Sequence, residues 1–178
     1  MPDRCELVPS LFHQLAGGAR IRYARLEPGG PARATALVAC GRREFIEKKL
    51  AESGAQLLDR GFRLIVFEWR GQGLSDRFLT GALRQRDHIT DFNVHLDDLS
   101  SFYENVVLPV QQGPLIAFGH SMGSHLLLRW FAERQKTGIH AAVLAAPMLA
   151  LGPRAAHVVA LGIGWTAGEF GFGENYGP

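Results

Sequence analysis

Short apolar runs alternate with longer stretches of helical period along this chain, and this alternation limits the fold more than any other feature. Runs that are apolar almost throughout are typical of strands buried on both faces of a sheet. They occupy residues 34–40, 63–69, 115–118 and 141–146. In the intervening stretches 44–60, 92–108 and 121–134, apolar residues recur every three or four positions. This order predicts βαβ units, and therefore an α/β fold with a mostly parallel sheet and helices on both faces.

The N-terminal segment follows a different pattern. Gly17 and Gly18 separate residues 11–16 from residues 19–27, and the second segment alternates apolar and polar side chains. This pattern predicts a β-hairpin. In open parallel sheets the chemistry lies at the carboxyl ends of the strands. The loops after Cys40, Trp69 and Phe118 are therefore the first places to look for a site.

Composition narrows the class of protein. The chain has 178 residues, of which 47% are hydrophobic and 20% charged, as expected for one globular domain. A net charge of +2 does not support a nucleic-acid partner. Two cysteines are too few for a disulfide framework, and Cys40 is expected to be a buried free thiol. Without a signal-like or membrane-spanning apolar segment, we expect a cytoplasmic protein that can touch membranes peripherally.

The loop after the third apolar run carries the motif Gly119-His120-Ser121-Met122-Gly123. An apolar run precedes it and an amphipathic stretch follows, which is the context of a Gly-X-Ser-X-Gly nucleophile elbow. Ser121 is the predicted nucleophile, and Gly119 and Gly123 let neighbouring backbone pass closely. The Met122 N–H is a predicted oxyanion-hole donor. The alternative is a serine that caps a helix after a glycine turn.

A second oxyanion donor is expected from the loop at residues 40–44. Gly41 allows a tight turn there, and the backbone N–H of Arg42 could face the Ser121 pocket. An ordinary strand-to-helix connection is the alternative.

The other motifs in the chain do not support a nucleotide site, an acid/base pair or a metal site. Residues 71–73 (Gly-Gln-Gly) lack the third glycine of a dinucleotide fingerprint, because Asp76 stands in its place. Asp97 and Asp98 are adjacent on a predicted helix and point in different directions, so they make a poor acid/base pair. No metal site is expected, because the remaining histidines lack ligand spacing: His13, His95, His125, His140 and His157.

Five segments in order resemble the lysophospholipase L2 and monoacylglycerol lipase group of S33-type α/β-hydrolases: residues 41–48, 68–75, 88–92, 119–123 and 146–148. The resemblance implies an α/β-hydrolase fold. It also implies hydrolysis of acyl esters, such as lysophospholipids or monoacylglycerols, through an acyl-serine intermediate without a cofactor.

The resemblance also raises the question of the catalytic acid and base. In this fold they follow the serine along the chain. After Ser121 there is no aspartate, and no residue matches the family's acid or base among Glu133, Glu169, Glu174, His125, His140 and His157. We therefore expect residues 1–148 to be the N-terminal part of the core and residues 149–178 the start of a cap. The C-terminal strands, most of the cap, the acid and the histidine would then lie beyond residue 178.

Three functions remain open at this point. The first is a serine ester hydrolase with a small acyl ester or lysolipid as its substrate. The second is a catalytically inactive remnant, or a non-enzymatic module on the same fold. The third is another reaction of this fold, by an acyltransferase, peptidase or thioesterase. A chain that ended here would leave an open sheet edge, through which it is expected to self-associate.

Overall fold

The computed structural model describes residues 10–83, 88–89, 91–134 and 138–149. The expected cap, residues 149–178, lies outside the described residues except for its first residue.

The described strands form one six-stranded sheet in the order β1-β2-β4-β3-β5-β6. Their bounds are β1 Leu11–Gln14, β2 Arg20–Leu26, β3 Ala34–Ala39, β4 Phe62–Phe67, β5 Leu115–His120 and β6 Ala141–Ala145. The last four strands are parallel to one another, whereas β1 and β2 form the predicted hairpin, whose strand β2 pairs with β4 in antiparallel orientation. The predicted α/β architecture is confirmed.

Helices connect the parallel strands. They are α1 Ile46–Lys49, the π-helical turn η2 Leu50–Gly54, α2 Ala55–Asp59, α3 Asn93–Phe102, the π-helical turn η4 Tyr103–Val107, the 3-10 turn η5 Leu108–Val110 and α4 Met122–Arg134. Two short 3-10 turns, η1 Ala16–Gly18 and η3 Gly81–Leu83, lie in loops. The stretch predicted as one helix over residues 44–60 is thus helical from Ile46 to Asp59, with a wider π turn in its middle.

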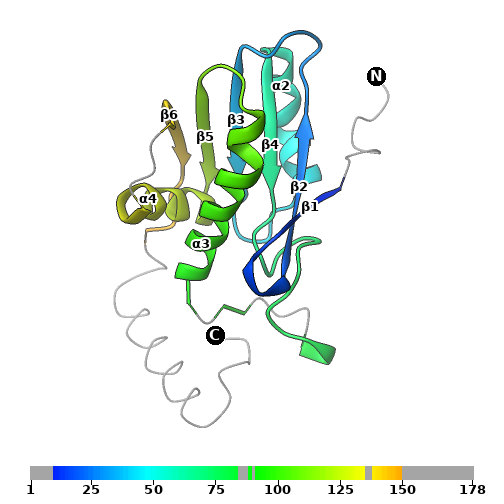
Figure 1. Cartoon of the computed structure of the whole chain (residues 1–178), viewed down its shortest axis with the longest axis vertical. Coiled ribbons are helices and arrows are strands. Elements are labelled where there is room, and N and C mark those ends of the chain that lie inside the picture. Colours follow the sequence, from blue (N-terminus) through cyan, green and yellow to red (C-terminus); the bar gives the residue numbers. More distant parts are fainter. Residues whose placement is uncertain (1–9, 84–87, 90, 135–137, 150–178) are drawn as a thin grey trace.

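Two apolar cores lie on the two faces of the sheet. The larger core packs α3 and α4 against one face and includes Phe67, Phe102 and Trp130. The smaller core packs α1 and α2 against the other face through Ile46 and its neighbours. Alternate residues of β3 and β4 point into each core, which explains their continuous apolar runs. The carboxyl ends of β3, β4 and β5 meet at the lower edge in Figure 1.

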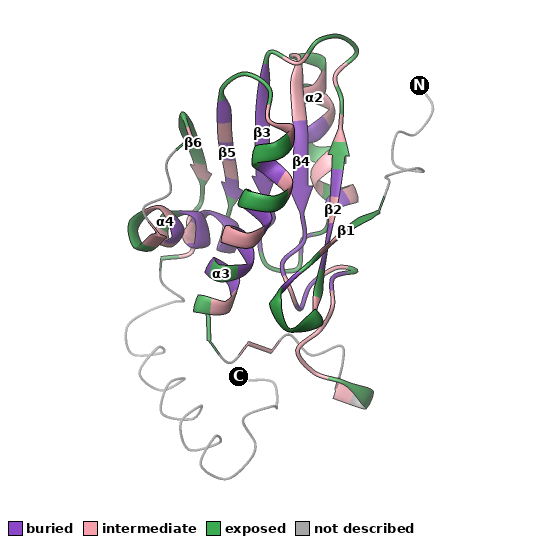
Figure 2. Cartoon of the chain, in the orientation of Figure 1, coloured by how far each residue is buried: buried purple, intermediate pink, exposed green. Residues whose placement is uncertain are grey.

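Burial falls from the inner strands to the outer one. All six residues of β3 are buried, whereas four of the five residues of β6 are exposed, and Val143 is 51% exposed. Figure 2 shows this contrast across the sheet. Within the described residues β6 is the last strand, so only β5 pairs with it.

Two smaller expectations are confirmed. Cys40 is a buried free thiol, and burial raises its pKa far above the usual range, so it stays protonated. Asp97 and Asp98 diverge, since Asp97 pairs with Arg134 and Asp98 pairs with Arg70.

Candidate active site

Ser121 lies at a sharp turn between β5 and α4 with a φ of 50°. A positive φ is strained for a residue with a side chain, and such strain gathers at functional sites. Among the described non-glycine residues, the others with positive φ are Arg43 and Ala146. All three follow the carboxyl ends of parallel strands. The strained positions therefore lie at the edge of the sheet where the chemistry was expected.

The two glycines of the motif permit very close backbone approaches. A Cβ on Gly119 would lie 2.8 Å from the Ser124 Cα. A Cβ on Gly123 would lie 2.6 Å from the Cys40 carbonyl oxygen and closer still to that of Ala39. Both distances are far below van der Waals contact. The turn therefore has the tight packing of a nucleophile elbow.

Gly123→Ala is expected to destabilise the protein by about 1–3 kcal/mol, because the added methyl group meets the backbone of a central strand, which cannot move aside. Urea denaturation measures the change. Gly30→Ala is the matched control, since a Cβ at Gly30 would meet nothing within 4 Å. Equal stability of the two variants would contradict the packing described for the elbow.

Backbone hydrogen bonds connect the elbow to the last residue of β6 and to the segment that follows it. The Ser121 N–H donates to the Ala145 carbonyl oxygen at 2.9 Å, and the Met148 N–H donates to the Ser121 carbonyl oxygen at 3.2 Å. The buried Ser124 hydroxyl also donates to the Ala145 carbonyl oxygen. These bonds hold Ser121 in its strained conformation. Met122 is the first residue of α4. The first N–H groups of a helix have no acceptor within the helix, and the Met122 N–H is one of them.

Side-chain acceptors hold the loop after β3. The Gly41 N–H donates to Glu44 Oε2 at 2.5 Å, and the Arg43 N–H donates to Gln72 Oε1 at 2.6 Å. The first acceptor lies in the same loop and the second in the loop after β4, and the Arg42 amide lies between the two donors in the sequence. The tight turn predicted at Gly41 is present, with the Glu44 N–H donating to the Gly41 carbonyl oxygen.

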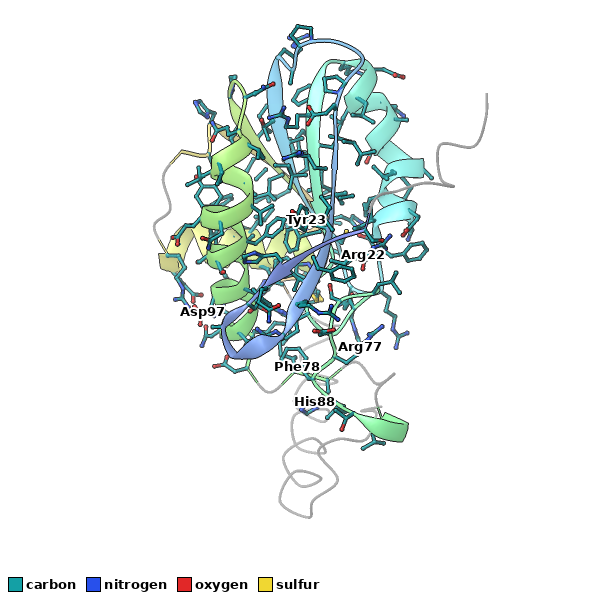
Figure 3. All side chains as sticks on the ribbon, turned by 45° about the vertical axis from the view of Figure 1, so that its right-hand side comes forward. Arg22, Tyr23, Arg77, Phe78, His88 and Asp97 are labelled. Atoms are coloured by element: carbon teal, nitrogen blue, oxygen red, sulfur yellow. The ribbon has the colours of Figure 1, made fainter. Side chains whose placement is uncertain are left out.

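Arg42 and Met122 line the same small pocket of about 160 Å³. Its other lining residues are Arg70, Gln72, His88, Ile89, Phe92, His95 and Met148. Four of the nine lining side chains are apolar, and the rest are cationic, imidazole or amide groups. Figure 3 shows His88 with Arg77 and Phe78 at the loop end of the molecule. The pocket thus combines an apolar lining with positive charge.

A buried network of ion pairs and hydrogen bonds around Glu68 holds the loop after β3 in place. Glu68 follows β4 and is fully buried, and its carboxylate accepts the N–H groups of Ile46 at 3.1 Å and Leu74 at 2.7 Å. Arg22 on β2 also donates to it at 3.0 Å. The Trp69 indole donates to the Cys40 carbonyl oxygen at 2.6 Å. The segment after β4 therefore fixes both ends of the loop after β3.

A second ion pair lies beside the pocket. Arg70 donates to both oxygens of Asp98, at 2.5 and 3.0 Å. Burial raises the pKa of Asp98 above its usual range in spite of these bonds. The ion pair itself compensates the charge of Arg70 beside the pocket. The Arg42 side chain is exposed.

The histidines that follow Ser121 along the chain do not meet its hydroxyl group in the described part of the chain. His125 donates its amide to the Ser121 carbonyl oxygen. His140 accepts the Leu115 N–H at the opposite end of the sheet, and Glu133 pairs with Arg129. His157, Glu169 and Glu174 lie outside the described residues. In the part of the chain that the structure describes, no three His, Cys, Asp or Glu side chains cluster so that they could hold a metal ion.

Met122 directly follows Ser121 and lines one pocket with Arg42, and the catalytic roles of these three residues stay predictions. Three further residues contact the loops around this pocket. They are Gln72, which the sequence singles out only as part of an incomplete nucleotide motif, and Glu44 and Glu68, for which the sequence predicts no role. All three follow a buried strand at the carboxyl edge of the sheet. A polar residue in the loop after a buried strand is the sequence signal by which these three residues could have been predicted.

Comparison with known proteins agrees with this geometry. A family model described as serine aminopeptidase, S33, matches residues 30–171. Lysophospholipase L2 of Escherichia coli strain K12 is 32% identical over 103 residues, or 58% of this chain and 29% of that protein. A probable lysophospholipase L2 of Haemophilus influenzae is 27% identical over 150 residues, or 80% of this chain and 46% of that protein. The chain thus spans less than half the length of these curated relatives.

Solved structures share the fold. A soluble variant of the monoglyceride lipase of Saccharomyces cerevisiae superposes with a TM-score of 0.66 at 18% identity, covering 93% of this chain and 54% of that one. In addition, no helix among the described residues combines the length and hydropathy needed to cross a bilayer. The family match, which extends over most of the chain, and the geometry of the elbow together place this chain in the serine aminopeptidase S33 family of α/β hydrolases.

Proposed function

We propose that this protein is a serine ester hydrolase that cleaves acyl esters such as lysophospholipids or monoacylglycerols. The observation that carries the proposal is the elbow: Ser121 has a φ of 50°, and Met122, the next residue, lines one pocket with Arg42. The serine is held in an unfavourable backbone conformation by bonds from two elements. Such a turn presents a hydroxyl group for attack.

The proposed reaction has two steps. The Ser121 Oγ attacks the acyl carbonyl while a histidine accepts its proton, and the N–H groups of Met122 and Arg42 stabilise the resulting oxyanion. Collapse of the intermediate expels the alcohol, which takes the proton from the histidine. Water then hydrolyses the acyl-serine in the same way. The histidine and its acid come from residues outside the described part of the chain.

The pocket supports the substrate class. Apolar side chains next to Met122 suit an acyl chain, and the exposed Arg42 side chain suits a polar or anionic head group. The names of the relatives, lysophospholipase and monoglyceride lipase, point to the same class. We place the protein in the cytoplasm, with peripheral contact to the membrane that supplies the lipid.

A substrate panel on the full-length protein tests the proposal. Lysophosphatidylcholine and a monoacylglycerol should be hydrolysed at least tenfold more efficiently than an aminoacyl anilide or an acyl thioester of matched size. Preference for the anilide would indicate a peptidase, and preference for the thioester a thioesterase. No turnover of any substrate would favour the non-enzymatic module.

A further inference from the structure

We infer that Glu44 is a positioning residue that holds the oxyanion loop against the nucleophile elbow. The inference rests on the proposed function and extends it to a residue that does not touch the substrate. Its basis is one buried carboxylate that contacts both segments of the site.

The contacts of Glu44 join two loops that are distant in the sequence. The residue is 5% exposed, and its Oε2 accepts the Gly41 N–H at 2.5 Å. Its Oε1 lies 2.9 Å from His120 Nδ1 and 2.8 Å from Lys49 Nζ. A carboxylate can only accept, so the His120 Nδ1 carries the hydrogen in this contact.

Two of the residues that Glu44 contacts are the sequence neighbours of the proposed oxyanion donor and of the nucleophile. Gly41 directly precedes Arg42, and His120 directly precedes Ser121. The carboxylate therefore binds the residue before the proposed oxyanion donor and the residue before the nucleophile. A displacement of Glu44 would change the distance between the Arg42 amide and the Ser121 hydroxyl group. Oxyanion-hole donors act only within a narrow range of distances.

The loop has little room to adjust by itself. A Cβ on Gly41 would lie 2.8 Å from Glu44 Oε2 and 3.1 Å from the His120 carbonyl oxygen, so the two backbones are already in close contact. On the far side of Arg42, Arg43 adopts a φ of 58° and donates its N–H to Gln72. The Arg42 amide is thus held from both sides, and Glu44 provides the side nearer the elbow.

Charge keeps the carboxylate in its accepting form. Burial by itself would raise the pKa of Glu44, but Lys49, the Gly41 amide and His120 outweigh it and hold the pKa below the usual range. Lys48 lies within 3.8 Å as well. Glu44 therefore accepts hydrogen bonds throughout the neutral range.

Glu44→Gln in the full-length protein is the informative variant. Glutamine has the same shape but one donor end, so its NH₂ group must meet either the Gly41 amide or the Lys49 ammonium, which are both donors. We expect kcat for a lysophospholipid to fall roughly 10- to 100-fold, with KM within about twofold of the wild type, because the loss is confined to the transition state.

Glu52→Gln is the matched control, because Glu52 lies in the π-helical turn η2 and, like Glu44, binds Lys49, but at the surface. Its kcat should stay within about twofold of the wild type. Glu44→Asp keeps the charge with a shorter reach, and its kcat should lie between those of wild type and Glu44→Gln. Thermal melting of each variant reports on folding.

The outcomes separate this inference from the proposed function. A folded Glu44→Gln variant with unchanged kcat, or with a raised KM alone, would overturn the positioning role. If the wild type hydrolyses no ester, the proposed function fails, and hydrogen exchange decides the role of Glu44. Exchange of the Gly41 amide should then be at least tenfold faster in Glu44→Gln and unchanged in Glu52→Gln. Equal exchange in both variants would overturn the inference.

Discussion

Ser121→Ala in the full-length protein should lower kcat/KM for a lysophospholipid ester by roughly 10⁴- to 10⁶-fold, as expected when a nucleophile is removed. Alanine keeps the Cβ that already occupies the left-handed conformation, so the backbone bonds to Ala145 and Met148 are retained. The stability of the variant should therefore change by less than about 0.5 kcal/mol. Substrate turnover and urea denaturation measure the two effects.

A fluorophosphonate probe provides the complementary measurement. It should label the wild type and a Ser53→Ala variant equally, because Ser53 is an exposed serine far along the chain from the elbow. It should not label Ser121→Ala. Labelling of Ser121→Ala at the wild-type rate would mean that another serine is the nucleophile, and the proposed mechanism would then be wrong.

Glu68→Ala should destabilise the protein by about 3–5 kcal/mol, the usual cost of removing one partner of a buried ion pair. The fully buried carboxylate accepts bonds from Arg22, Ile46 and Leu74. Its removal leaves the buried Ile46 amide and the partly buried Leu74 amide without this acceptor, while Arg22 keeps Glu47 at 2.5 Å. The free energy of unfolding in urea measures the loss.

Glu68→Gln and Glu52→Ala make this prediction specific. The glutamine keeps the shape and one acceptor, so its loss should be roughly half that of the alanine variant. Glu52 is exposed, and its replacement should leave the urea midpoint of unfolding close to that of the wild type. If Glu68→Ala and Glu52→Ala are equally stable, the Glu68 network does not hold the loops after β3 and β4 together.

Much of the fold was predictable because its signals are local. Continuous apolar runs predict all four parallel strands. For β3 and β4 the reason is that both faces of the strand are covered, so neither face needs polar residues, whereas β6 is mostly exposed among the described residues. Gly17 and Gly18 predict the hairpin, because two adjacent glycines between two strand-like segments favour a tight turn. The π turn at Leu50–Gly54 was not predicted, because the helical period continues across it almost unchanged.

The site was predictable only in part. The motif around Ser121 and the loop at Gly41 and Arg42 follow from residue types at fixed spacing. The contacts of Glu44 with His120 and of Gln72 with Arg43 did not follow, because they span 76 and 29 residues. No local pattern encodes which buried polar group meets which amide.

The sequence by itself determined the class of fold, the order of its elements and the serine at the elbow, because apolar periodicity and glycine positions act over a few residues. Only the tertiary structure decided how the oxyanion loop is held. The parallel sheet brings the ends of β3, β4 and β5 to one edge, and there Glu44, Glu68 and Gln72 satisfy amides of the loop after β3. Buried donors must find acceptors, and which acceptor lies within reach depends on the packing of the whole sheet.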